Sequence, residues 1–285
     1  MIRYTYDNGL PFSDIYKENI EDLNKRVEER FASLLIIDGG VGKGKTTLCV
    51  HTADYINKLH GFPEIKFKEQ LATGGADFLK KIRICYDKKL PVIIYSEAGD
   101  FNKRGALSKF NAMLTRTFET FRAFKIVVLL DLPNFNVLDN GLFDNNIPRL
   151  LIHVDNRDMN YGNFSGYSLY RMFYLRKKME KLTVKTFAYE LVHPNFRGHF
   201  LNLPPAREKA LDLYTVKGKL KTLRGAEIDM EGLLSYNKMA AKLGKSVSWI
   251  RQQCYKLKIK ESRTINKVKY FNEVSFNRLA DLLEK

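Results

Sequence analysis

Short apolar runs recur along the first half of the chain, and each is followed by a segment whose apolar residues return at helical spacing. Such runs, rich in Val, Ile and Leu, are typical of strands buried on both faces of a parallel sheet. The sequence predicts strands at residues 34–38, 92–95, 125–130 and 150–154. It predicts helices at residues 14–31, 47–59, 76–88 and 106–123. This alternation predicts an α/β domain of three layers with a mostly parallel sheet.

The loop after the first predicted strand carries the most specific motif. Residues 39–46 read Gly-Gly-Val-Gly-Lys-Gly-Lys-Thr and match all of G-x-x-x-x-G-K-[ST], the phosphate-binding P-loop. Glycines permit positive φ, and the exposed backbone N–H groups together with the helix N-terminus bind phosphate. We expect Lys45 to reach the β- and γ-phosphates of ATP and the Thr46 hydroxyl to ligate Mg²⁺.

The sequence thus predicts a site for ATP and Mg²⁺. Its predicted nucleotide-binding residues are Gly39, Gly40, Val41, Gly42, Lys43, Gly44, Lys45, Thr46 and Thr47. The Lys43 side chain has two readings that stay open, a contact with phosphate and a position in solvent.

The second predicted strand ends in Ser96-Glu97. An apolar strand followed by two acidic residues is the Walker B pattern, in which the first carboxylate holds Mg²⁺ and the second polarises the attacking water. Glu97 keeps the catalytic position, whereas Ser96 accepts hydrogen bonds but brings no negative charge. We therefore predict Ser96 as a weak metal ligand and expect slow turnover, with Asp100 as one candidate for the missing charge.

Asp131 ends the next predicted strand, just before Pro133. It is either a polar residue that senses the γ-phosphate or a turn residue at a strand end. We also expect a further strand to separate the P-loop strand from the Glu97 strand in the sheet.

Charge is unevenly distributed. The whole chain has a formal net charge of +16, but residues 1–160 hold 23 Lys and Arg against 21 Asp and Glu, while residues 161–285 hold 25 against 11. A near-neutral domain followed by a basic part indicates a polyanionic partner, with DNA as the first candidate and an anionic membrane surface as the second. Residues 161–200 are rich in Tyr and Phe, which fits either packed strands or a nucleic-acid surface.

Three cysteines, Cys49, Cys85 and Cys254, are odd in number and far apart. They suggest neither a disulfide framework nor a zinc site, which favours a reducing, cytoplasmic setting. No apolar stretch approaches the ~18 residues that span a bilayer, and the first residues lack a signal-peptide core.

Residues 233–259 resemble a helix-turn-helix. Ser235 is a helix N-cap residue, Ala240 is small where two helices approach, and Gly244 suits a turn with positive φ. Leu243 and Ile250 occupy core positions. A strand at 265–271 and a helix at 275–283 predict a winged variant.

The second helix, at about 246–256, is then the recognition helix that lies in the major groove of duplex DNA. The predicted DNA-binding residues are Lys245, Ser248, Trp249, Arg251, Gln252, Tyr255, Arg263, Lys267 and Lys269. The alternative is a small helical module that binds protein. The predicted segments are an N-terminal helical segment at 1–31, a P-loop ATPase domain at 32–200, a basic linker at 201–231 and the helix-turn-helix domain at 232–285.

Residues 32–157 resemble P-loop ATPases of the additional-strand, catalytic-glutamate division. The resemblance rests on residues 39–46, on the strand ending in Glu97, and on Leu132-Pro133-Asn134-Phe135. Within that division the chain is most similar to FtsK/HerA-type DNA pumps and to the zonula-occludens-toxin-like ATPases of phages and mobile elements. The resemblance implies a homo-oligomer, with a hexameric ring as one form, and an arginine supplied by a neighbouring subunit, for which Arg149 and Arg157 are the candidates.

Two functions follow from these observations. The first is an ATP-driven DNA motor for translocation, packaging, transfer or replication, in which Lys45 and Glu97 are catalytic. The second is a nucleotide-switched DNA-binding regulator or loader with little turnover. Glu97 favours the motor, and Ser96 favours the switch.

Overall fold

The computed structural model divides the chain into two compact units, Met1–Lys219 and Leu220–Lys285. The structure describes residues 4–29, 31, 34–96, 124–138, 140–157, 161–228, 234–259, 261, 263–265, 268–271 and 273–281.

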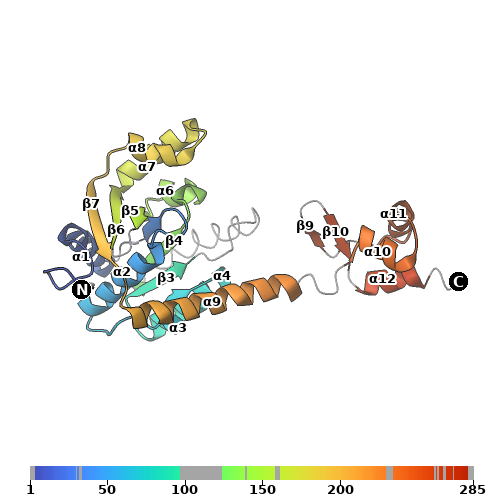
Figure 1. The fold of residues 1–285 in the computed structure, drawn as a ribbon, viewed down its shortest axis with the longest axis horizontal. Coiled ribbons are helices and arrows are strands. Elements are labelled where there is room, and N and C mark those ends of the chain that lie inside the picture. Colours follow the sequence, from blue (N-terminus) through green and yellow to red (C-terminus); the bar gives the residue numbers. More distant parts are fainter. Residues whose placement is uncertain are drawn as a thin grey trace. The chain divides into compact units, whose positions relative to one another are not determined.

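The first unit is built on a seven-stranded sheet in the order β2-β3-β4-β1-β5-β6-β7 (Figure 1). The strands are β1 (Leu34–Asp38), β2 (Leu71–Ala72), β3 (Val92–Ser96), β4 (Val127–Leu132), β5 (Pro148–Arg157), β6 (Tyr161–Ser168) and β7 (Phe196–Leu201). Strands β2, β3, β4, β1 and β5 are parallel, whereas β6 and β7 run antiparallel at one edge. Strand β4 lies between β1 and β3, which confirms the expected intervening strand.

Helices cover both faces of this sheet. The described helices of the first unit are α1 (Asp14–Glu28), α2 (Lys45–Leu59), α3 (Phe67–Gln70), α4 (Gly75–Asp87), η2 (Phe135–Val137), α6 (Asn140–Asp144), α7 (Leu169–Lys181), η3 (Lys185–Phe187), α8 (Ala188–Leu191) and the greater part of α9 (Pro205–Ile228). The residues of α9 from Leu220 onward belong to the second unit. Alternate residues of β1 point to opposite faces, so Leu34 and Ile36 join one core while Leu35 and Ile37 join the other. The predicted three layers are confirmed.

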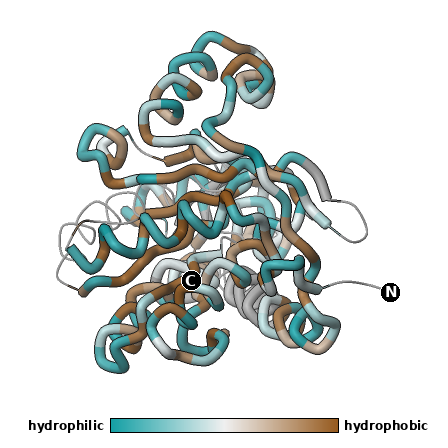
Figure 2. Tube along the Cα trace, turned by 90° about the vertical axis from the view of Figure 1, so that its left-hand side faces the viewer, coloured by the Kyte–Doolittle hydropathy of each residue, from teal (hydrophilic) through white to brown (hydrophobic). Residues whose placement is uncertain are grey.

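Different helices pack into the two cores. One contains side chains of α4, α6, α7 and α8, and the other contains side chains of α1, α2 and α9. In Figure 2 the helices alternate between hydrophilic and hydrophobic residues along their length, as expected of helices that bury one face. On α1 the buried face is formed by Tyr16, Ile20, Leu23 and Val27.

In the first unit, the predicted strands and helices agree with the structure where it describes them, with shifts of a few residues. The predicted helix at 106–123 lies outside the described residues. Strand β2 and helix α3 were missed because each is too short to show a periodic pattern. Of the two readings of residues 161–200, strand packing holds for Phe164 and Tyr167, which are buried, whereas Tyr170 on α7 is 79% exposed.

The second unit contains α10 (Tyr236–Leu243), α11 (Val247–Lys256) and α12 (Glu273–Ala280). Its small sheet has the order β8-β10-β9, with β8 at Leu234–Ser235, β9 at Arg263–Ile265 and β10 at Val268–Phe271. The prediction of one strand at 265–271 was wrong, because the chain reverses between β9 and β10, which pair antiparallel. A separate apolar core centred on Met239, Ile250 and Phe271 holds these elements together.

Within the described ranges, no helix combines the length and the hydrophobicity required to cross a bilayer.

Candidate nucleotide site and nucleic-acid surface

The P-loop joins the carboxyl end of β1 to the amino end of α2. Gly44 is the N-cap residue of α2 and adopts the left-handed conformation, with φ 86°. Gly39 and Gly42 also have positive φ, at 142° and 78°. A side chain at Gly39 would in addition place its Cβ 2.7 Å from the carbonyl oxygen of Val154 on β5. The loop therefore needs its glycines both for conformation and for close approach to β5.

The two lysines of the loop contact backbone oxygens. Lys45 Nζ donates a hydrogen bond to the Gly40 carbonyl at 2.9 Å, across the loop itself. Lys43 Nζ donates to the Asp155 carbonyl at 2.8 Å, beyond the end of the loop. Lys45 is thus held at the loop, while Lys43 joins the loop to β5.

Thr46, at the amino end of α2, comes together with Ser96 and Asp131, at the carboxyl ends of β3 and β4. Thr46 Oγ1 donates to Asp131 Oδ2 at 2.6 Å, and Ser96 Oγ donates to the same oxygen at 3.3 Å. Both Ser96 and Asp131 are buried. Neither of the two roles predicted for Asp131 included this contact with the P-loop threonine.

These residues line a cavity of about 380 Å³. Its walls are formed by Val41, Gly42, Gly44, Lys45, Thr46, Thr47, Ser96, Asp131, Pro133, Glu208, Leu211, Asp212 and Thr215. The last four belong to α9 and were not predicted as site residues. Their spacing over two turns, one apolar and three polar residues on one helix face, is a signal visible in the sequence, but the sequence does not show which cavity that face meets.

A second cluster of polar side chains lies at the end of β1, just before the loop. The Asp38 carboxylate, at the end of β1, has His153 Nδ1 at 2.8 Å and accepts hydrogen bonds from the Tyr189 hydroxyl at 2.5 Å and from the Phe135 N–H at 2.9 Å. The His153 and Tyr189 rings stack with centroids 3.6 Å apart. Burial and the neighbouring Asp38 raise the pKa of Tyr189 well above its usual value. This group fixes the residue that precedes Gly39.

The other predicted catalytic residues are placed as follows. Glu97 and Asp100 lie outside the described residues. Arg149 lies at a register irregularity near the amino end of β5, beside the start of β1, and the P-loop follows the opposite, carboxyl end of β1. Arg157 ends β5 on the P-loop side of the sheet.

In the second unit, α10 and α11 are joined through Gly244, which has φ 59°. Ser235 caps α10 by accepting from the Lys238 N–H at 3.3 Å, and Ser246 caps α11 by accepting from the Trp249 N–H at 3.1 Å. The expected roles of Ser235 and Gly244 are confirmed. The structure thus shows two capped helices joined by a tight turn.

Most predicted DNA contacts on α11 are exposed, namely Ser248, Arg251, Gln252 and Tyr255. Tyr255 is 88% exposed. Trp249 is instead partly buried against the core of this unit, with Lys245 Nζ 5.9 Å from its ring centre. Arg263 lies on β9, Lys269 lies on β10, and Lys267 lies outside the described residues.

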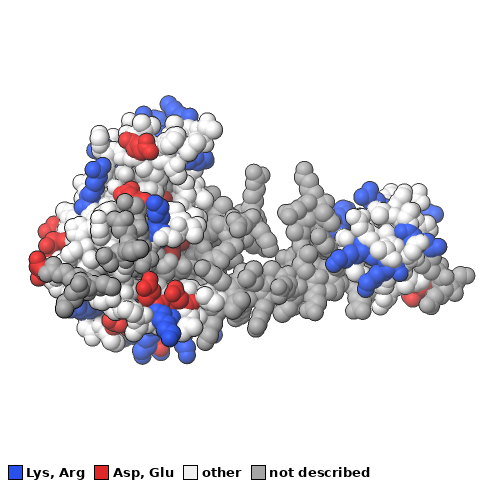
Figure 3. All heavy atoms as spheres, viewed as in Figure 1, with Lys and Arg blue, Asp and Glu red and all other residues white. Residues whose placement is uncertain are grey.

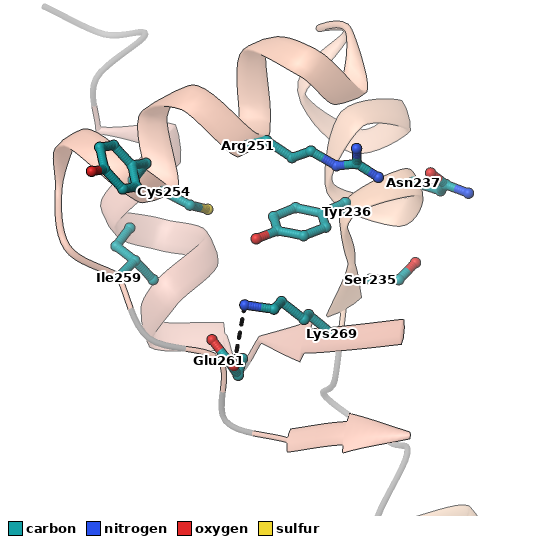
Figure 4. A pocket seen from close by; sticks show the side chains of 9 residues that line it. Ser235, Tyr236, Asn237, Arg251, Cys254, Ile259, Glu261 and Lys269 are labelled. Carbon is teal, nitrogen blue, oxygen red and sulfur yellow. Dashed lines mark ion pairs between the residues drawn. The ribbon is translucent and has the colours of Figure 1, made fainter. Parts of the chain in front are cut away.

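A hollow of about 560 Å³ separates α11 from β10 in this unit. Figure 4 shows the Tyr236 ring between the side chains of Arg251 and Lys269. The Arg251 guanidinium lies 5.5 Å from the centre of that ring, and Lys269 forms an ion pair with Glu261 at 3.2 Å. Three of the predicted DNA contacts, Arg251, Tyr255 and Lys269, therefore border one hollow.

The surface of the second unit is basic (Figure 3). Its described exposed cations are Lys238, Lys242, Lys245, Arg251, Lys256, Lys258, Lys269 and Arg278. Against these, the described exposed acidic residues are Glu261 and Asp281. The charge excess of the sequence thus appears on a folded surface.

The glycine loop between β1 and α2, the insertion of β4 between β1 and β3, and the helices on both faces define the first unit as a P-loop NTPase fold. Comparison with models of known protein families and with curated proteins gives no match.

Among solved structures, the chain is similar to one from the HORMA:CdnC:Trip13 complex of E. coli MS115-1, with a TM-score of 0.33 and 14% identity over 62% of this chain and 71% of that chain. It is also similar to the N-terminal domain of zonular occludens toxin from Neisseria meningitidis, with a TM-score of 0.29 and 16% identity over 48% of this chain and 84% of that chain. It is similar as well to the replication initiator DnaA bound to AMPPCP and single-stranded DNA, with a TM-score of 0.33 and 13% identity over 82% of this chain and 71% of that chain.

Proposed function

We propose that this protein binds and hydrolyses ATP at the P-loop and binds duplex DNA through its second unit. The observation that carries the first part is the glycine loop at the head of α2, which opens on a cavity that Lys45, Thr46 and Asp131 line. Backbone N–H groups, a lysine ammonium and a threonine hydroxyl are the groups that bind a nucleoside triphosphate.

The donor set fits Mg²⁺, which prefers oxygen ligands and shares them with phosphate. The hydroxyl oxygens of Thr46 and Ser96 each lie within hydrogen-bond distance of Asp131 Oδ2 at the cavity. In the described part of the chain, no group of three or more His, Cys, Asp and Glu side chains could hold a metal ion. A magnesium site here would therefore combine these few protein oxygens with oxygens of the nucleotide phosphates, and a bound Mg²⁺ would neutralise phosphate charge.

For hydrolysis we assign Lys45 to the β- and γ-phosphates and Glu97 to the attacking water. Arg157, at the carboxyl end of β5, remains a candidate to act on a neighbouring subunit of a homo-oligomer. Arg149, near the amino end of β5 and so far from the P-loop along the strand, stays a candidate only for a contact between subunits.

For DNA binding we assign α11 as the recognition helix of a winged helix-turn-helix, with the β9–β10 hairpin as the wing. The exposed side chains of α11, the hollow bordered by Arg251 and Lys269, and the basic surface support this assignment. The finer proposal is a DNA motor that works as a ring in the cytoplasm, with a domain limit near residue 232.

The second candidate function is a nucleotide-switched DNA-binding regulator with little turnover. It is favoured by Ser96, which ends β3 without a negative charge where a metal-holding carboxylate is expected. Such a protein would bind ATP as tightly as a motor does.

The deciding experiment measures ATP hydrolysis at low salt with and without duplex DNA, for the natural protein and for Lys45→Ala. The motor predicts DNA-stimulated turnover that Lys45→Ala abolishes, together with a nucleotide-dependent oligomer in light scattering. ATP binding without turnover would contradict the motor and leave the switch. Absence of ATP binding would overturn both.

A further inference from the structure

The carboxylate that Ser96 lacks is present on the neighbouring strand. Ser96 of β3 and Asp131 of β4 are register partners, and Asp131 is in turn the partner of Ile37 on β1. Paired residues of adjacent parallel strands lie about 4.8 Å apart and point to the same face. Asp131 is therefore one strand closer than Ser96 to the strand that carries the P-loop.

This shift brings the carboxylate directly to the P-loop threonine. Asp131 Oδ2 receives the Thr46 hydroxyl at 2.6 Å and the Ser96 hydroxyl at 3.3 Å. Since a hydroxyl that donates its hydrogen keeps its oxygen lone pairs for a cation, the Thr46–Asp131 contact leaves the Thr46 oxygen able to ligate a metal. Ser96 is then a donor that holds the carboxylate in place.

The charges around the cavity agree with a cation there. Of the described side chains that line it, Asp131, Glu208 and Asp212 are acidic, and Lys45 is basic. Asp131 is only 6% exposed, and a carboxylate withdrawn from water is stabilised by a nearby cation. A divalent ion that arrives with the nucleotide would supply that charge.

We propose that Asp131 is the carboxylate that binds Mg²⁺ with the nucleotide, so that the metal-holding role has moved from β3 to β4. The inference rests on the proposed function, because it assumes a nucleotide at the P-loop. It removes the reason to expect weak metal binding from Ser96. The role of Ser96 is to position Asp131.

The test measures the affinity for a fluorescent ATP analogue with excess Mg²⁺ and again with EDTA, so that the ratio of the two affinities reports the metal alone. A second readout is Mn²⁺ bound in the presence of the nucleotide, followed by electron paramagnetic resonance. The variants are Asp131→Asn, which keeps the size and the acceptor oxygen, Ser96→Ala, and the exchange variant Ser96→Asp/Asp131→Ser. Circular dichroism checks that each variant folds.

Asp131→Asn should lower the Mg²⁺-dependent gain in nucleotide affinity about tenfold or more and weaken Mn²⁺ binding by a similar factor. Its affinity in EDTA should not fall, because without the metal this variant only removes a negative charge that repels the phosphates. Ser96→Ala should lower the gain by less than Asp131→Asn, and the exchange variant should regain part of it. A natural protein that binds nucleotide with a Mg²⁺-dependent gain, and an Asp131→Asn variant that keeps that gain, would overturn the role of Asp131 alone. A natural protein that binds no nucleotide in either buffer would overturn the proposed function as well.

Discussion

Arg207 of α9 forms an ion pair with Asp54 of α2, with 2.8 Å between Nη2 and Oδ1. Each side chain is only 19% exposed. Arg207 also donates to the Ile65 carbonyl at 2.9 Å, and its guanidinium lies 4.5 Å from the centre of the Phe67 ring. The ion pair holds α9 against α2. Helix α9 lines the nucleotide cavity, and α2 begins at the P-loop.

Asp54 makes the stability of the first unit depend on pH. Burial raises the pKa of Asp54 to about 6 from its ordinary 3.8, although Arg207 acts in the opposite direction. Between these two values the folded state binds more protons than the unfolded state, so the free energy of unfolding falls as pH rises from about 4 to about 6. The fall contributed by this group is at most about 3 kcal/mol.

Urea unfolding measured at pH 4.5 and at pH 7 checks this dependence. We expect Asp54→Asn to lose less stability than the natural protein between the two pH values. Arg207→Gln should be destabilised by about 3 kcal/mol at pH 7, because it leaves a buried carboxylate without its cation, and by less at pH 4.5, where Asp54 is protonated. Equal losses at both pH values would contradict the assignment.

Gly39→Ala should destabilise the P-loop, although the substitution adds only one methyl group. The added Cβ would lie 2.7 Å from the Val154 carbonyl oxygen, and φ of 142° is strained for any residue but glycine. We expect a loss of about 2–4 kcal/mol in the free energy of unfolding and a loss of nucleotide affinity. Gly75→Ala is the matched control, because its Cβ meets no atom within 4 Å, and it should be neutral or slightly stabilising.

Asp212 lines the cavity from α9 and carries the same sign of charge as the phosphates. Asp212→Asn should therefore raise the affinity for ATP about two- to fivefold at low salt, with a smaller gain at high salt. Isothermal titration at two ionic strengths measures both. Asp144→Asn, exposed at the end of α6, should leave the affinity unchanged, and an unchanged affinity in Asp212→Asn would show that this carboxylate does not face the nucleotide.

The parts of this fold that depend on residues close together in the sequence could be predicted. The glycine loop, the buried strands beside it and the Ser235 cap follow from residue types a few positions apart. Strands β9 and β10 were misread as one strand because the alternation of 265–271 continues through the reversal between them.

The composition of the nucleotide cavity could not be predicted, because it depends on contacts between distant residues. Asp131 meets Thr46 across 85 positions, and only the order of the strands shows that β4 lies beside β1. The acidic residues of α9 reach the cavity through tertiary packing. Trp249 was expected to face outward, but it is held against the core of its unit, since a large aromatic ring gains more from partial burial than from exposure.

Arg251 is the residue that best tests DNA binding by the second unit. It is exposed on α11, lies over the Tyr236 ring and borders the hollow shared with Lys269. If it contacts a phosphate, Arg251→Ala should weaken binding to duplex DNA and reduce the slope of log affinity against log salt by about 1. Arg251→Lys should retain that slope because it keeps the charge.

Fluorescence anisotropy with a labelled duplex, at several salt concentrations, measures both quantities. Lys185→Ala removes an exposed charge from the first unit and serves as the control, because it should change neither affinity nor slope if the first unit does not contribute to initial docking. A slope that Arg251→Ala leaves unchanged, while Lys185→Ala lowers it, would place the DNA on the first unit. The basic surface of the second unit would then serve another polyanion.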